Sequence, residues 1–213
     1  MRRNRRGPGN VARAGKAERR RLDERKALRL LLLVFAGFLV AIGGGFWLLQ
    51  NMAPAPIGGP FRLTAGDGRV VTDRDFRGNY LLIYFGYTYC PDVCPTTLQS
   101  VAVALDRLGP KSAKIQPLFV TVDPARDTPA LLAQYPAAFS PRLLGLSGTP
   151  DEIAAIEREY RIYAAIHRGG STGYTVDHSS ALFLMGPDGR FVASLPADMA
   201  GPDLATAIAR DLS

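Results

Sequence analysis

The sequence predicts a mixed α/β sheet covered by helices and preceded by one transmembrane helix. Three observations support this fold class. A long run without charged residues lies near the N-terminus, short apolar runs of strand composition follow it, and segments with helical spacing and capping residues separate those runs. Because strands that alternate with helices form sheets with helices on their faces, the order of the segments implies a mixed sheet.

The N-terminal segment predicts a membrane anchor. The chain of 213 residues carries a net charge of +7, yet residues 1–29 contain twelve Lys or Arg against three acidic residues, a net +9, which leaves −2 for the remainder. Residues 30–49 contain no charged side chain. At about 1.5 Å per residue, this run spans the roughly 30 Å hydrocarbon core of a bilayer. We therefore expect a basic tail over residues 1–29 and a transmembrane helix over residues 30–49.

The charge asymmetry also predicts the orientation of that helix. Basic flanks remain in the cytoplasm, so the following domain is expected in the periplasm or another exported space. A cleaved signal peptide has a shorter apolar region of about 7 to 15 residues, which favours an uncleaved single pass through the inner membrane. Anionic lipid and topology account for the basic tail, so no nucleic-acid partner is expected.

Residues 50–60 are rich in Pro, Ala and Gly and read as a linker, which leaves residues 61–213 as one domain. Its first segment, residues 61–72, has a turn composition between two extended runs and predicts a hairpin. The unbroken apolar run at residues 80–85 predicts a strand buried on both faces. Pro95 and leucines at helical spacing predict a helix over residues 95–108, and residues 115–122 predict another apolar strand.

The second half of the domain repeats these signals. Thr128 and Pro129 begin an expected helix over residues 128–139, and residues 143–146 form a short apolar run. An N-cap Thr, a Pro and a Glu three positions on predict a capped helix over residues 149–160. A turn composition inside residues 181–195 predicts a second hairpin, and residues 202–212 predict a closing helix.

The two cysteines of the chain, Cys90 and Cys94, follow the strand at residues 80–85. With no other cysteine in the sequence, they can pair only with each other, with a partner or with a metal. A proline follows each, which disfavours helical backbone at both and predicts a constrained loop. A nearby helix N-terminus favours the thiolate, the form that binds metals and attacks disulfides.

Three interpretations of this cysteine pair remain open from the residues alone. A structural disulfide would close a short loop and stabilise little. A metal site would use two thiolates, which suit copper(I) or zinc, and would need a third ligand. Thiol–disulfide exchange is the third interpretation, although three residues separate the cysteines where thioredoxin-like reductases commonly have two.

The chain contains two histidines, His167 and His178, as candidates for that third ligand. We expect His167 to be a surface residue at a strand end. His178 precedes the strand at residues 181–185 and is expected on a loop that leads into it. Asp177 is placed to hydrogen-bond the imidazole of His178 and orient it.

Three segments together resemble the signature segments of the Sco/SenC family: residues 84–97, 120–129 and 176–179. The resemblance implies a thioredoxin-like fold tethered by one N-terminal helix. It also implies a copper-binding assembly factor for cytochrome c oxidase, with Cu(I) and/or Cu(II) held by Cys90, Cys94 and His178. Tyr89 stands where many members have histidine, a position that is not a required ligand.

The segment at residues 120–129 has a simpler explanation as a turn before a helix. We expect Asp127 and Thr128 to cap that helix. Asp123 and Arg126 are candidates for ordering the loop or for contacting a partner.

The predicted function is that of a copper chaperone without enzymatic turnover. It would pass copper to the copper-site subunit of cytochrome c oxidase and exchange with other copper carriers or thiol reductants. Copper binding requires reduced thiols and a neutral His178, so a disulfide between Cys90 and Cys94 would prevent loading. The alternative is a thiol–disulfide oxidoreductase that reduces the cysteines of the oxidase copper site and does not need His178.

Overall fold

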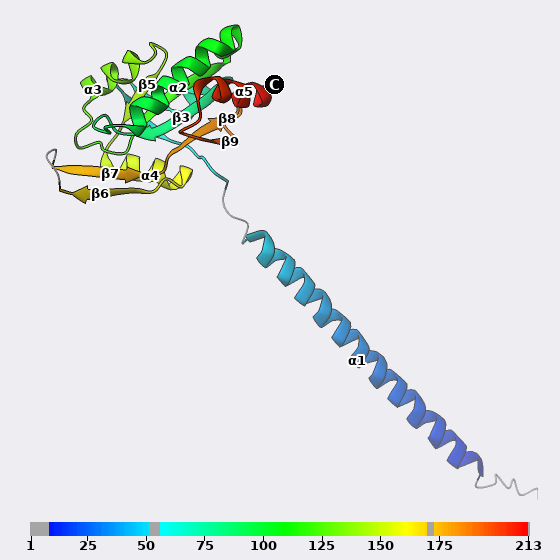
Figure 1. Ribbon diagram of the computed structural model, residues 1–213. Coiled ribbons are helices and arrows are strands. Elements are labelled where there is room, and N and C mark those ends of the chain that lie inside the picture. The colour runs from blue at the N-terminus through cyan, green and yellow to red at the C-terminus, as the bar shows by residue number, and fades with distance from the viewer. Residues whose placement is uncertain (1–8, 52–55, 170–172, 213) are drawn as a thin grey trace, which may run out of the picture. The chain divides into compact units, whose positions relative to one another are not determined.

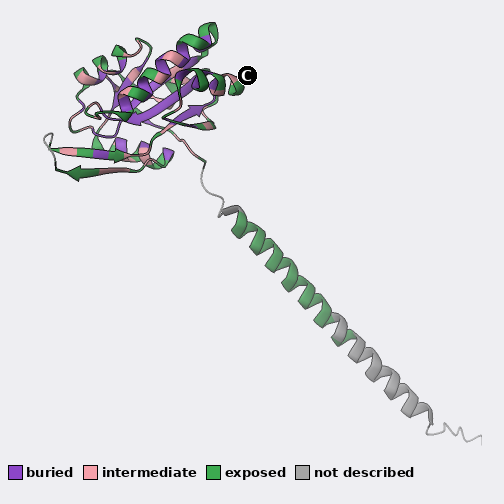
Figure 2. Cartoon of the chain, in the orientation of Figure 1, coloured by how far each residue is buried: buried purple, intermediate pink, exposed green. Residues whose placement is uncertain are grey.

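A computed structural model describes residues 9–51, 56–169 and 173–212 of the chain. The chain divides into two compact units, Met1–Ala55 and Pro56–Ser213. The first unit contains helix α1 (Gly9–Asn51). Within it, Arg29–Leu49 has a mean hydropathy of 2.3 and no buried residue, as the exposed colouring in Figure 2 shows, and is long and apolar enough to span a membrane.

The second unit is built on a seven-stranded sheet with the strand order β2-β1-β5-β4-β3-β8-β9, and β6 and β7 form a separate two-stranded sheet (Figure 1). The strands are β1 (Arg62–Ala65), β2 (Val70–Thr72), β3 (Tyr80–Gly86), β4 (Ile115–Thr121), β5 (Leu144–Ser147), β6 (Ala164–Arg168), β7 (Tyr174–His178), β8 (Ala181–Met185) and β9 (Phe191–Pro196). The pairs β3–β4 and β4–β5 are parallel and the remaining pairs are antiparallel. The mixed sheet predicted from the sequence is confirmed.

Helices cover both faces of this sheet. The α-helices of the unit are α2 (Val93–Leu108), α3 (Pro129–Gln134), α4 (Pro150–Tyr160) and α5 (Gly201–Asp211), and the 3₁₀ turns are η1 (Asp73–Phe76), η2 (Gly109–Lys114) and η3 (Pro136–Ala138). One core cluster joins Leu82 of β3 to α2 and α5, and the other joins Ile83 to α4. All seven residues of β3 are buried, as expected for a central strand.

Local sequence signals place most of these elements correctly. Both predicted hairpins form, β1 with β2 and β8 with β9. The expected helix over residues 128–139 ends at Gln134, because Pro136 opens a 3₁₀ turn and cannot continue the α-helical hydrogen bonds. The pairing of β6 with β7 was not predicted. The expected strand end at His167 falls within β6, but three of the five residues of β6 are exposed and β7 is only five residues long.

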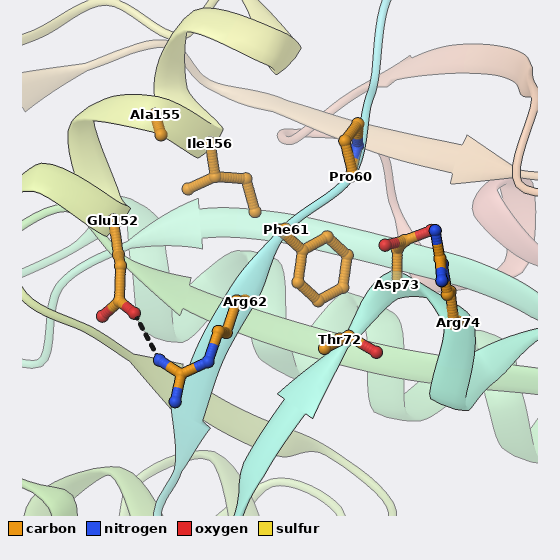
Figure 3. Close-up of a pocket in the computed structure, with 9 residues that line it drawn as sticks. All are labelled: Pro60, Phe61, Arg62, Thr72, Asp73, Arg74, Glu152, Ala155 and Ile156. Atoms are coloured by element: carbon orange, nitrogen blue, oxygen red, sulfur yellow. Dashed lines mark hydrogen bonds and ion pairs between the residues drawn. The ribbon is translucent and has the colours of Figure 1, made fainter.

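An ion pair ties the first hairpin to α4. Arg62 Nη1 donates to Glu152 Oε1 at 2.8 Å, the dashed contact in Figure 3. Beside this pair lies a groove of about 500 Å³. It is lined by the residues directly before β1 and by residues of β1, η1 and α4, including Phe61, Asp73 and Ile156. Because Glu152 also accepts the Thr149 backbone N–H at 2.9 Å, one carboxylate joins the hairpin to the start of α4.

The capping box at the start of α4 gives a stability prediction. The Thr149 hydroxyl accepts the backbone N–H of Glu152, so Thr149→Ala removes an acceptor that the helix start needs. We expect the free energy of unfolding of residues 56–213 to fall by about 1 kcal/mol. Urea denaturation followed by near-ultraviolet circular dichroism measures it. Thr149→Ser retains the hydroxyl and should stay near the wild type; an equal loss in both variants would contradict the role of the cap.

Candidate metal centre

Two sulfurs and one imidazole meet at the end of β3. Cys90 lies in the connection after β3, Cys94 is the second residue of α2, and His178 is the last residue of β7. One ligand atom from each residue lies within 4.8 Å of the other two. Both cysteines are free thiols, and Cys94 Sγ lies 3.6 Å from His178 Nε2. The structure therefore brings together the three residues named from the sequence as metal ligands.

Cys94 belongs to the first turn of α2 and not to a loop, which corrects the expectation from Pro95. The first four N–H groups of a helix have no partner within it, so a proline in the first turn loses no hydrogen bond. Gly86 leaves room for the sulfur, because a Cβ at that position would lie 2.8 Å from Cys94 Sγ and 2.9 Å from the Phe119 ring. The glycine at the end of β3 thus makes space for the buried thiol.

The imidazole of His178 is held with one nitrogen facing the sulfurs. Its Nδ1 lies 3.0 Å from the carbonyl oxygen of Ser179, so an Nδ1–H donates there and leaves the lone pair of Nε2 toward Cys94. The rings of Tyr84 and Tyr87 meet the imidazole edge-on, at centroid distances of 6.2 and 5.9 Å. His178 ends a strand and does not lie in a loop, which corrects its expected placement.

The two thiols differ sharply in protonation. The hydrogen bond from the Cys94 side chain, together with the Cys94 backbone N–H at 3.4 Å, lowers the pKa of Cys90 to about 4. The pKa of Cys94 is raised, because it donates that hydrogen bond and is fully buried. At neutral pH the pair therefore holds one accessible thiolate and one buried thiol.

The donor set fits a soft, low-coordinate metal ion. With ligand bonds of about 2.0 to 2.3 Å, three donors around one ion lie about 4 Å apart, so the observed separations need only a small contraction. Thiolate and imidazole donors suit copper(I) or zinc. Tyr84 adds a hydroxyl that donates to Cys94 Sγ at 3.6 Å, and burial raises the pKa of that phenol, which keeps it protonated.

The loop at residues 123–128 supports the centre. Thr128 caps α3 as expected, its hydroxyl accepting the Leu131 N–H at 3.3 Å. Asp127 does not cap the helix: it is buried and accepts from the backbone and hydroxyl of Thr88 and from the hydroxyl of Thr121. This long-range contact ties the cysteine connection to the end of β4, a partnership with no local sequence signal.

The other predicted polar residues lie farther from the cluster. The carboxylate of Asp177 is exposed and pairs with His167 at 2.9 Å, while the Nδ1 of His178 faces Ser179, so Asp177 does not orient His178 as expected. His167 is an exposed residue of β6, consistent with the predicted surface position. Asp123 and Arg126 form an ion pair beside the cysteine connection.

The aromatic residues around the centre were not singled out from the sequence. Tyr84, Tyr87 and Tyr174 contact His178 or the neighbouring loop through their rings or hydroxyls. The signal for Tyr84 and Tyr87 is the group of tyrosines between residues 84 and 89, which by itself does not distinguish the lining of a site from an ordinary core; Tyr174 has no such signal.

The fold and the cluster define a thioredoxin-like protein with a Cys–Cys–His group suited to a soft metal. A family model described as SCO1/SenC matches residues 50–213. The chain belongs to the SCO1/SenC family.

Individual relatives agree with this assignment. The chain is 40% identical over 204 residues to the mitochondrial SCO2 homologue of Bos taurus, covering 87% of this chain and 74% of that protein. It is similar to the solved structure of Bradyrhizobium japonicum ScoI with copper bound, with a TM-score of 0.68, 44% identity, and coverage of 73% of this chain and 99% of the other. Yeast Sco1 with copper bound gives a TM-score of 0.67, 37% identity, and coverage of 73% and 87%.

The protonation of the pair can be tested in the metal-free, reduced protein. Because a hydrogen bond from Cys94 lowers the pKa of Cys90, Cys94→Ala should raise that pKa and reduce the thiolate fraction at pH 6. The pH dependence of the iodoacetamide alkylation rate measures this. Cys94→Ser retains a donor and should keep the midpoint low; equal midpoints in the wild type and Cys94→Ala would show that Cys94 is not the cause.

Proposed function

We propose that this chain is a membrane-anchored copper carrier for the assembly of the dinuclear copper centre of cytochrome c oxidase. The observation that carries the proposal is the approach of two cysteine sulfurs and one imidazole nitrogen to within 4.8 Å, in a member of a family with copper-bound solved structures. Copper is the cargo of the protein and is released to a client, so the site must bind it firmly and still expose it.

The residues divide this task between them. The Cys90 thiolate is partly exposed and is the first donor that an arriving ion meets. Cys94 is buried and protonated, so binding through it releases a proton to solvent. The imidazole of His178, with Nδ1 against the Ser179 carbonyl, presents Nε2 to the ion as the third donor. A client ligand can replace these donors one at a time, beginning at the exposed thiolate.

The proposed location follows from α1. The span Arg29–Leu49 would cross the inner membrane once, with the basic tail in the cytoplasm and the copper-binding unit in the periplasm. The copper-site subunit of the oxidase is the expected client, and other copper carriers or thiol reductants are expected to load or reduce the cysteines.

A thiol–disulfide oxidoreductase is the second candidate, and one observation favours it. A thiolate at Cys90 with a neighbouring buried Cys94 is the arrangement that attacks a disulfide and then resolves the mixed disulfide. In that reaction the two cysteines become a disulfide and the client disulfide becomes two thiols. His178 is not needed for the electron balance, which separates the two candidates.

The two histidines provide a matched test of copper binding. Under anaerobic, reducing conditions we expect one Cu(I) to be retained per wild-type chain, and His178→Ala to weaken binding by at least tenfold, because the ion loses one of three donors. His167→Ala removes an exposed histidine outside the cluster and should bind as the wild type does. Competition with a chromophoric Cu(I) chelator measures both affinities.

Oxidase assembly in cells that carry each variant separates the two candidate functions. The carrier function requires His178→Ala, Cys90→Ser and Cys94→Ser all to reduce the copper content of the oxidase. Normal assembly with His178→Ala, together with failure in both cysteine variants, would contradict the carrier and support the oxidoreductase.

A further inference from the structure

His178 ends a hairpin that joins the main sheet only through β8, which begins at Ala181. β7 pairs only with β6 among the described strands, in the separate two-stranded sheet visible in Figure 1. Main-chain ladder bonds therefore do not fix this hairpin against β3 and the cysteines. The register of β8 on β3 brings the end of β7 near the cysteines. Side-chain contacts between the hairpin and the loops beside it then orient the imidazole toward the sulfurs.

Arg126 makes several of these contacts at once. Its guanidinium carbon lies 3.6 Å from the ring centroid of Tyr174, the first residue of β7, and its Nη1 donates to the Tyr174 carbonyl at 2.9 Å. The same guanidinium carbon lies 4.8 Å from the ring of Tyr89 and 5.6 Å from the ring of Tyr87. One side chain thus spans β7 and the connection that leads to Cys90.

The Asp123 carboxylate fixes the guanidinium of Arg126 and the ring of Tyr174 together. Its Nε donates to Asp123 Oδ2, and the hydroxyl of Tyr174 donates to the other oxygen of the same carboxylate at 2.8 Å. Its Nη2 is buried and has no hydrogen-bond partner among the described residues. Tyrosine rings around a cation stabilise it without hydrogen bonds, so the aromatic cage explains why this nitrogen is tolerated.

Tyr87 lies between the guanidinium of Arg126 and the imidazole of His178. Its ring meets that of His178 edge-on at 5.9 Å and 89°, and its hydroxyl accepts the backbone N–H of Val176 at 3.4 Å. Arg126 therefore touches β7 at its first residue and also touches the ring against which the last residue of β7 rests. Removing the guanidinium would remove a contact at the first residue of β7 and a contact on the ring beside its last residue.

We propose that Arg126 is a positioning residue that holds the β6–β7 hairpin so that His178 Nε2 faces the two sulfurs. This rests on the proposed function only where copper affinity is the readout. The guanidinium itself touches neither the sulfurs nor the imidazole in the contacts described above, so it acts through Tyr87 and Tyr174.

The test uses the full-length chain in detergent, with Arg126→Met. Met keeps much of the side-chain length and removes the charge and the donors. If Arg126 acts through His178, Arg126→Met should lower Cu(I) affinity about as much as His178→Ala, by at least tenfold, and the double variant should bind no more weakly than His178→Ala alone. Full additivity of the two losses would overturn the proposal.

Arg142→Met is the matched control for general destabilisation. Arg142 also donates to main-chain oxygens, those of Ser112 and Ile115, at the opposite end of β4. We expect this variant to lose stability without losing copper affinity. An equal loss of affinity in Arg126→Met and Arg142→Met would reduce Arg126 to a structural residue and overturn the proposal.

A metal-free readout separates failure of this proposal from failure of the copper assignment. With only two histidines in the sequence, the imidazole signals of a histidine- and tyrosine-labelled chain can be assigned. We expect a nuclear Overhauser effect between the Tyr87 and His178 rings in the wild type and its loss in Arg126→Met. Should Arg126→Met fail to fold, Tyr174→Leu removes the stacked ring and should cause the same loss. Persistence of the effect in a folded variant would overturn the proposal, whether or not the chain binds copper.

Discussion

The approach of His178 Nε2 to Cys94 Sγ is the contact on which the metal centre depends, because the two residues are 84 positions apart in the chain. Sheet register produces it. Tyr84 of β3 faces Leu182 of β8, so the residues just before β8 lie beside those just after β3. Gly86 then leaves space for the sulfur, and the carbonyl of Ser179 sets which imidazole nitrogen faces it. Strand register, the space left by Gly86 and the hydrogen bond at Nδ1 together place His178 Nε2 3.6 Å from Cys94 Sγ.

The unequal environments of the two sulfurs explain how one site can bind an ion and also give it up. A fully buried, protonated Cys94 closes the inner side of the cluster, while the partly exposed Cys90 is ionised and accessible to a partner. The same asymmetry would suit disulfide exchange, which is why the imidazole decides between the two functions. The electron balance of disulfide exchange needs only the two sulfurs, whereas a copper site built on two sulfurs needs a third donor, which the imidazole supplies.

Local signals in the sequence were enough for the central strands, the two main hairpins and the capped start of α4, because turn composition, apolar runs and capping boxes act over a few residues. They were not enough for Asp127, whose partners Thr88 and Thr121 are brought to it by the tertiary fold. They also missed the pairing of β6 with β7, because β6 is largely exposed and was indicated only by the expected strand end at His167. His178 was selected through the family resemblance, since its distance from the cysteines depends on sheet register and not on spacing.

X-ray absorption at the copper edge of the Cu(I)-loaded, full-length chain tests the central claim most directly. The account predicts three donors, two sulfurs at about 2.3 Å and one nitrogen at about 2.0 Å, with the nitrogen contribution absent in His178→Ala. A spectrum of the wild type with two sulfur donors alone, unchanged in His178→Ala, would contradict it.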